Sequence, residues 1–285
     1  MKQLNIFLFL SSFLLTIGCS SCTKEVKMET PIPSIEDANF TIHSHQDNGL
    51  EKFTRKVEVF GLSIYAVPTV EEAKLLHAAN VMAQYLDNDE DGLVDNPLVI
   101  EKMIENKAFV VMWKTEEDID IDPPADRLGQ DLGNDETQPL FVANGKTGAF
   151  DATLEEILHI ITHAGYAYAY PDVFGEEAGT TLSEAMDIAR GGHFTSIPSV
   201  YPDEAWYSYD DATCDYNCQS TEYLYWSLTS LLGAQENRLN EISHEWKLNT
   251  PALLQNTDLA IYNLLTNPEY KLPTVLPDGA YRRDE

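Results

Sequence analysis

Two histidines and a glutamate in one stretch of the chain have the spacing of a metal site. His159 and His163 are four residues apart, so on an α-helix they lie on one face, one turn above the other. A second helix that carries Glu184 could fold back and add a carboxylate to the pair. Two imidazoles and a carboxylate are a common ligand set for catalytic zinc, with a fourth position open to water. The stretch therefore predicts a zinc site with His159, His163 and Glu184 as ligands.

These segments resemble the zincin metallopeptidases of the thermolysin type. His159-Ile-Ile-Thr-His163 followed by Ser183-Glu184-Ala-Met-Asp187 is similar to that family's His-Glu-x-x-His helix and the later helix that bears its glutamate ligand. The resemblance implies a zinc-dependent hydrolase in which Asp187 supports the ligands by hydrogen bonding. The chain departs from the family at Ile160, where the family has the glutamate that acts as general base.

Two glutamates one turn before His159 offer a substitute for the missing base. On a helix Glu156 projects about 60° from His159, whereas Glu155 projects about 40° to the other side. Glu156 is therefore the candidate general base, and Glu155 a candidate hydrogen-bond partner of an imidazole. The alternative interpretation is an amphipathic helix with an acidic first turn and half-buried histidines.

The segment 87–98 has the ligand spacing of a calcium loop. Carboxylates occupy its first, third and fifth positions, and Gly92 at the sixth permits the sharp turn. This is the first half of an EF-hand loop, in which these oxygens converge on one hard cation. Leu98 replaces the glutamate of the twelfth position, so the missing oxygen must come from Asp95 or from Glu101 on the next helix. The expected calcium ligands are Asp87, Asp89, Asp91, Leu93 through its carbonyl group, and Asp95.

The first residues have the pattern of a bacterial lipoprotein signal. Lys2 precedes an apolar run over 6–17 that is too short to span a membrane, and small residues follow it. We expect a signal peptide over 1–18 and a lipid on Cys19, with Cys22 as the weaker candidate and a plain secretory signal as the alternative. Both interpretations place the mature protein outside the cytoplasm, in the periplasm or on the outer surface of the cell envelope.

The charge of the chain limits its partners. Lys and Arg number 18 against 47 for Asp and Glu, which gives a net charge of −29. Such a surface repels nucleic acid and anionic lipid headgroups, and it attracts divalent cations. We therefore expect no nucleic-acid partner, and contact with a membrane only through the N-terminal lipid.

The two cysteines outside the signal region, Cys214 and Cys218, predict a disulfide. In an oxidising compartment a local disulfide is the default for such a pair. A structural zinc site would need two more ligands, and no second thiol or histidine pair lies nearby in sequence.

Hydrophobic periodicity predicts a mainly helical α+β fold with a few strands. We expect a tether over 19–55 and a single globular domain over 56–285, in which the calcium loop joins two helices and 151–190 forms a zincin-like helix pair. A loop is expected over 129–133. Strands are predicted over 56–65, 108–113 and 139–143, and helices from 70, from 151, around Glu184, and over 220–235, 241–246 and 258–265.

Two hypotheses of function follow from these features. The first is a surface-anchored, zinc-dependent hydrolase; the second is a non-catalytic, calcium-stabilised lipoprotein, either a pseudoenzyme or a binding module. Ile160 favours the second. Glu222, which lies among aromatic residues, is either a buried carboxylate that faces the site or a surface residue, and His193 could approach the site as ligand or proton donor.

Overall fold

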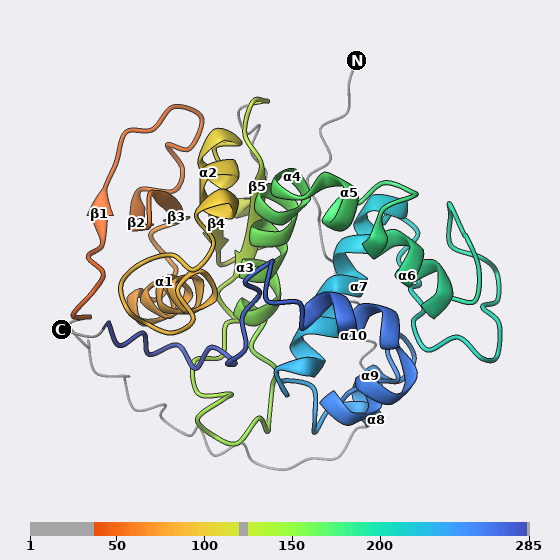
Figure 1. Ribbon diagram of the computed structural model, residues 1–285. Coiled ribbons are helices and arrows are strands. Elements are labelled where there is room, and N and C mark those ends of the chain that lie inside the picture. The colour runs from red at the N-terminus through yellow and green to blue at the C-terminus, as the bar shows by residue number, and fades with distance from the viewer. Residues whose placement is uncertain (1–36, 120–124, 284–285) are drawn as a thin grey trace, which may run out of the picture.

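A five-stranded mixed sheet and a set of surrounding helices form the fold (Figure 1). The computed structural model describes residues 37–119 and 125–283. The predicted α+β class is confirmed. The predicted signal peptide, Cys19 and Cys22 lie outside the described residues. Within the described part of the chain, no helix combines the length and apolar character needed to cross a membrane.

The strand order in the sheet is β1-β2-β3-β4-β5. The first two pairings are antiparallel, whereas β3–β4 and β4–β5 are parallel. All five residues of β4 are buried or half-buried, as the apolar run over 108–113 predicts. The bounds are β1 His43–Ser44, β2 Arg55–Val59, β3 Leu62–Ala66, β4 Phe109–Trp113 and β5 Gly129–Gly133.

The strand predicted over 56–65 is a hairpin of two strands, β2 and β3. Phe60 and Gly61 form the two-residue turn with φ values of 48° and 88°. Positive φ at both central residues is the geometry of a type I′ turn, which suits the twist of the flanking strands. Phe60 concealed the turn in the sequence, because an aromatic residue rarely adopts positive φ.

The segment 129–133 is a strand, not the loop that was expected. The aromatic ring of Phe109 on the neighbouring β4 packs over Gly129, where an added Cβ would lie 2.5 Å from Cζ of that ring. Glycine is needed here for close approach, although it is a weak indicator of a strand. The strand predicted over 139–143 is a turn, in which Phe141 is buried and Leu140 is exposed.

Helices α1 and α2 flank the predicted calcium loop, and α3 carries the predicted zinc ligands. A π-helical turn, η2 (Thr162–Tyr166), interrupts the helix after α3. The helix bounds are α1 Glu72–Leu86, α2 Pro97–Glu105, η1 Glu116–Asp118, α3 Thr153–Ile161, α4 Ala167–Ala169, α5 Pro171–Phe174, α6 Thr181–Ala189, α7 Tyr216–Leu231, α8 Leu239–Ile242, α9 Pro251–Thr257 and α10 Leu259–Leu265.

Helix α3 lies at the centre of the molecule (Figure 1). It packs against α1 and β5 on the side of the sheet and against α7 on the other side. The η2 turn packs against α2 through Gly165, where an added Cβ would lie 2.7 Å from Val99 and 2.9 Å from Met103. Helix α3, which carries the predicted metal ligands, therefore lies between α1 and the sheet on one side and α7 on the other.

The globular fold begins well before residue 56, so the tether boundary at residue 55 is wrong. Leu50 and Phe53 are buried in the core. Asn39 donates a hydrogen bond from Nδ2 to the carbonyl oxygen of Tyr281 at 2.8 Å, and the Phe40 ring lies 6.1 Å from the Tyr281 ring. The polar composition of the segment concealed these few apolar anchors.

Candidate functional site

A buried ion pair fixes the start of α3. Nε2 of His77 on α1 lies 2.7 Å from Oδ2 of Asp151, and Oδ1 of Asp151 accepts from the backbone amides of Gln138 at 2.8 Å and Thr153 at 3.3 Å. Burial acts to raise the pKa of Asp151, but the hydrogen bond and charge of His77 together with the backbone donors bring that pKa below its usual value. The first turn of α3 is thereby held to α1.

His159 on α3 lies between two carboxylates from different helices. Its Nε2 is 3.3 Å from Oε1 of Glu222 on α7 and 3.8 Å from Oε1 of Glu155, one turn earlier on α3. The side chains of His159 and Glu222 are each 3% exposed, whereas that of Glu155 is 22% exposed. Glu155 therefore lies beside an imidazole, although 3.8 Å is too long for the hydrogen bond that was predicted, and of the two alternatives for Glu222 the structure has the buried one.

The spacing of these three groups suits a metal ion. Each offers one ligand atom, and the three atoms lie within 4.8 Å of one another. Two ligands bound to zinc at about 2.0–2.1 Å in tetrahedral geometry are themselves about 3.3 Å apart. The distance of 3.3 Å between Glu222 and His159 matches that separation, and the distance of 3.8 Å between Glu155 and His159 is somewhat longer.

Tyr225 on α7 lies beside two of the candidate ligands, His159 and Glu155. Its ring lies 5.4 Å from the imidazole of His159, and its hydroxyl group is hydrogen-bonded to Glu155. Gln235 donates to the Tyr225 hydroxyl at 3.3 Å and accepts from Nη1 of Arg238 at 2.8 Å. This arrangement fixes the orientation of a side chain that would bind a metal, as hydrogen-bond partners outside a metal's own shell do.

Negative charge accumulates around the group. Burial, followed by the charges of Glu155, Glu245 and Asp211, raises the pKa of Glu222 well above its usual value. The pKa of Glu245 is raised to about 7, first by burial and then by Asp210 and Glu155. Carboxylates gathered in this way are unfavourable unless a proton or a cation is shared among them.

Glu156 does not occupy the position of a general base, so this prediction is wrong. Its carboxylate is buried and accepts a hydrogen bond of 2.5 Å from Nε2 of Gln130 on β5. Burial, and then the charges of Glu155, Asp131 and Glu136, raise its pKa well above the usual value. Glu156 therefore faces the sheet, and Glu155 is the glutamate beside His159.

His163 belongs to a different group of side chains. Both carboxylate oxygens of Glu176 lie near its Nδ1, at 2.8 and 3.0 Å, and the Thr221 hydroxyl donates to Glu176 at 2.8 Å. Burial acts to lower the pKa of His163, but the hydrogen bond and charge of Glu176 raise it overall. Consecutive residues of α7, Thr221 and Glu222, thus lead to different histidines of the central helix.

The predicted ligand set of His159, His163 and Glu184 does not form. Within residues 37–119 and 125–283, only two groups of acidic or histidine side chains bring three ligand atoms within 4.8 Å, and neither contains His163 or Glu184. Glu184 is exposed on α6, because Leu182, Ser183, Ala185 and Met186 form the buried face of that helix. The exposed face of α6 therefore carries the carboxylate away from the core.

Asp187 and His193 also lie in a group of their own. Asp187 accepts from Nη2 of Arg190 at 2.8 Å and from the Tyr216 hydroxyl at 3.0 Å, and its Oδ2 lies 2.6 Å from Nδ1 of His193. The expected support of zinc ligands by Asp187, and the approach of His193 to them, are not part of this arrangement.

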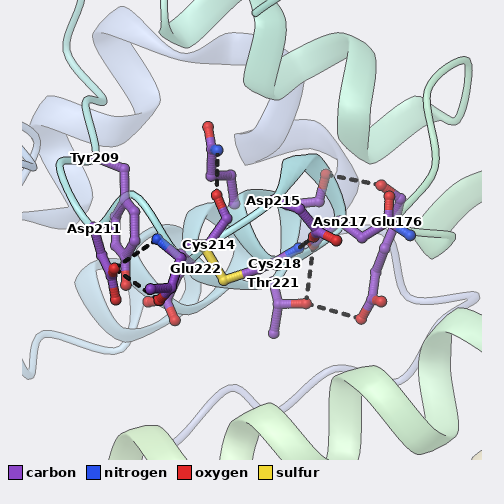
Figure 2. The surroundings of a disulfide bond; sticks show 12 residues. Glu176, Tyr209, Asp211, Cys214, Asp215, Asn217, Cys218, Thr221 and Glu222 are labelled. Atoms are coloured by element: carbon purple, nitrogen blue, oxygen red, sulfur yellow. Dashed lines mark hydrogen bonds between the residues drawn. A yellow bond between two sulfur atoms is a disulfide. The ribbon is translucent and has the colours of Figure 1, made fainter. Parts of the chain in front are cut away.

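The predicted disulfide between Cys214 and Cys218 is present at the start of α7, with 5.3 Å between the Cα atoms. Figure 2 shows Tyr209 and Asp211 on one side of it, and Glu176 and Thr221 on the other. Asp215 caps α7 by accepting from the Cys218 amide at 3.0 Å. The disulfide therefore braces the end of α7 that carries Glu222, the partner of His159, and Thr221, which donates to Glu176.

The predicted calcium loop brings its first three aspartates together. Ligand atoms of Asp87, Asp89 and Asp91 lie within 4.8 Å of one another. Oδ2 of Asp87 accepts from the Gly92 amide at 2.8 Å, and Gly92 has φ of 89°. Only glycine adopts this conformation without strain, which explains the residue at the turn.

The fourth carboxylate near the loop is Asp95. Burial, followed by the charges of Asp89, Asp87 and Asp91, raises its pKa. Its Oδ2 accepts from the amide of Asn88 at 2.7 Å. Neither Asp95 nor Glu101 belongs to the group of three converging ligand atoms, so the source of the missing oxygen stays a prediction.

Comparison with models of protein families, with curated proteins and with solved structures finds no match to this chain.

Proposed function

We propose that this protein is a zinc-dependent hydrolase of the bacterial cell envelope, with its metal centre at Glu155, His159 and Glu222. The convergence of three ligand atoms within 4.8 Å, from two helices and largely out of solvent, carries the proposal. An imidazole with two carboxylates is a donor set that suits zinc and related divalent metals. The zincin resemblance suggests the class of chemistry, although the ligand set proposed here differs from the one it implies.

Zinc in such a site acidifies a bound water and polarises a carbonyl or phosphoryl group. The residues of this chain would supply the remaining parts. Glu155 is the most exposed of the three ligands and marks the side from which a substrate can approach, while Tyr225 holds its carboxylate in place. Glu245, whose pKa is raised to about 7, is the nearby carboxylate best suited to exchange a proton.

A non-catalytic metal-binding lipoprotein is the second candidate. Ile160, which stands where zincins have their base, is buried in the core, and His159 and Glu222 are almost wholly buried. A structural zinc would be expected in such surroundings.

The deciding experiment is metal content by mass spectrometry on protein purified without its predicted signal. We expect about one zinc per chain in the wild type, which His159→Ala and Glu222→Gln lose. The matched control is His163→Ala, which should retain its zinc because His163 pairs with Glu176. Loss in His163→Ala but not in Glu222→Gln would contradict the proposed ligand set. A zinc-loaded protein that cleaves no peptide or ester would leave the second candidate.

We propose in addition that the loop over 87–95 binds calcium as a structural ion, and that a lipid on Cys19 anchors the chain. The loop has the spacing of Asp87, Asp89 and Asp91 in sequence and their convergence in space to support it. Calorimetry with calcium on wild type and Asp91→Asn tests the loop, and mass spectrometry of the N-terminal peptide tests the lipid.

A further inference from the structure

The last segment of the chain lies across the calcium loop. We call residues 270–283 the C-terminal strap; it runs from α10 past α3 to α1 (dark blue in Figure 1). Leu272, Pro273, Pro277 and Tyr281 are its buried residues, and the others are exposed or half-buried. The strap contains no helix or strand, so its position depends largely on side chains of the elements below it.

Asn88, between the first two calcium ligands, is the main anchor of the strap. Its Oδ1 accepts from the backbone amides of Thr274 at 2.8 Å and Val275 at 2.9 Å. Its Nδ2 donates to the carbonyl oxygen of Val275, also at 2.9 Å. One side chain thus pairs with the strap backbone on both donor and acceptor sides. These bonds require the backbone between Asp87 and Asp89 to hold its conformation.

The end of the strap contacts the acidic side chains of the loop. The Tyr281 hydroxyl donates to Oδ2 of Asp87, and the Arg282 amide donates to Oε2 of Glu90 at 2.7 Å. The guanidinium group of Arg283 lies over Gly92, where an added Cβ would be 2.5 Å from its Nε. The loop therefore lies next to a cationic side chain of the protein itself. This observation does not depend on the spacing of the predicted calcium ligands.

The strap also joins the loop to the central helix. Asn96, which caps α2 at the end of the loop, donates to the carbonyl oxygen of Tyr270 at 2.8 Å. The hydroxyl group of Tyr166, in the η2 turn, lies 3.1 Å from the carbonyl oxygens of both Tyr270 and Lys271. Release of the strap would free these contacts as well.

We propose that calcium in the loop holds the C-terminal strap in place, and that removal of calcium releases it. Without a cation the three converging aspartates of the loop repel one another, and the loop loses the conformation that presents Asn88 and Asp87 to the strap. With calcium bound, those two side chains are fixed. This inference rests on the proposed calcium site. By linkage, whatever factor calcium adds to docking of the strap, the docked strap adds to calcium affinity.

Cleavage after Lys271 by a lysine-specific endoproteinase measures release, because the carbonyl group of the bond that is cut accepts a hydrogen bond from Tyr166 while the strap is docked. On the full chain we expect calcium to slow the appearance of the peptide that begins at Leu272 by at least about fivefold, within the range of typical coupling. Asn88→Ser keeps every calcium-binding carboxylate, yet it should be cut at the same rate with and without calcium. Its calcium affinity should fall by the factor by which calcium protects the wild type. Asn263→Ser, at an exposed position on α10, is the matched control and should behave as wild type.

Two outcomes overturn the proposal and differ in what they imply. If calorimetry detects no calcium binding to the wild type, the loop assignment fails and the coupling fails with it. If calcium binds but cleavage after Lys271 proceeds at the same rate with and without it, the coupling alone is wrong.

Discussion

The two groups of carboxylates that can hold a cation are built in opposite ways. Asp87, Asp89 and Asp91 come from one short loop, and two of the three are exposed to water. Glu155, His159 and Glu222 come from two helices, and two of the three are buried. Water can stabilise the charges of the loop when no ion is present, whereas the buried group has only the protein around it. An empty loop should therefore cost the fold less free energy than an empty buried centre, even though it would release the C-terminal strap.

The largest expected effect is the stabilisation of metal-free protein by zinc. Zinc at about 1,000 times its Kd should raise the free energy of unfolding by about 4 kcal/mol, because it binds only the folded centre. Calcium at about ten times its Kd should add only about 1.4 kcal/mol. Urea unfolding with each metal in turn measures both. Because this stabilisation depends only on the ratio of metal concentration to Kd, an effect of either metal well below its stated value would show that the metal does not bind the folded site alone.

Next in size is the anchor of α3, on which the buried centre depends and the loop does not. Asp151→Ala leaves the buried His77 without its partner and should lower the free energy of unfolding by about 3 kcal/mol. Zinc affinity should fall with it, because Glu155 lies one turn along α3, whereas calcium affinity should stay the same. Urea unfolding and calorimetry with both metals distinguish the outcomes; an equal loss of calcium affinity would contradict the separation.

The same residue gives a pH test. The pKa of Asp151 is lowered in the folded protein, so its contribution is fully present above the unfolded value of about 3.9 and is lost as the pH falls through the lower folded value. Asp151→Asn should therefore lose less stability than wild type on acidification below about pH 4. Parallel curves for the two proteins would show that this carboxylate does not contribute.

The disulfide should matter about half as much as zinc. Closing a loop of this size contributes about 2 kcal/mol, so Cys214→Ser combined with Cys218→Ser should lower the free energy of unfolding by that amount. Zinc affinity should also fall, because Glu222 projects from the same end of α7, and calcium affinity should not. Calorimetry on the double variant with each metal measures both effects.

The smallest expected effects come from neutralising one carboxylate in each group, Glu222 in the buried centre and Asp91 in the loop. Burial raises the pKa of Glu222, so its ionised form destabilises the metal-free fold as the pH rises through the folded value. At alkaline pH, Glu222→Gln should therefore stabilise metal-free protein by about 1 kcal/mol while abolishing zinc binding. Asp91→Asn, at an exposed position, should change the stability of metal-free protein by less than about 0.5 kcal/mol while weakening calcium binding. Destabilisation by Glu222→Gln would show that its buried charge is already compensated without metal.

One group of ligands is local in sequence and the other is built from two helices, and this difference determines how much of each could be predicted from the sequence. Asp87, Asp89, Asp91 and Gly92 are ligands and turn in one continuous motif, so their convergence follows from local spacing. The helix that carries His159 could also be predicted from its periodicity. The partner of His159 could not, because Glu222 reaches it only through the packing of α7 on α3. A glutamate among aromatic residues was the one available signal.

The spacing of His159 and His163 suggested a shared ligand set that the fold does not make. Four residues on a regular helix place two side chains on one face, but His163 lies in the η2 turn, where the helix is π-helical. Glu176 then pairs with His163, and Glu222 with His159. Neither the π-helical turn nor the identity of the two carboxylates is encoded in the interval between the histidines.

The contact of Asn39 and Phe40 with Tyr281 has a consequence for the order of the chain. Because the two ends of the described chain meet, a short flexible linker can join residue 283 to residue 37. New ends can then be opened in the turn over 145–148, where an added Cβ on Gly145 or Gly148 meets no other atom within 4 Å. In such a circular permutant the strap becomes an internal connection. In the natural order the strap is synthesised last, whereas in the permutant it would be synthesised before residues 37–145. Comparing the two proteins would show whether folding depends on the order in which the segments are synthesised.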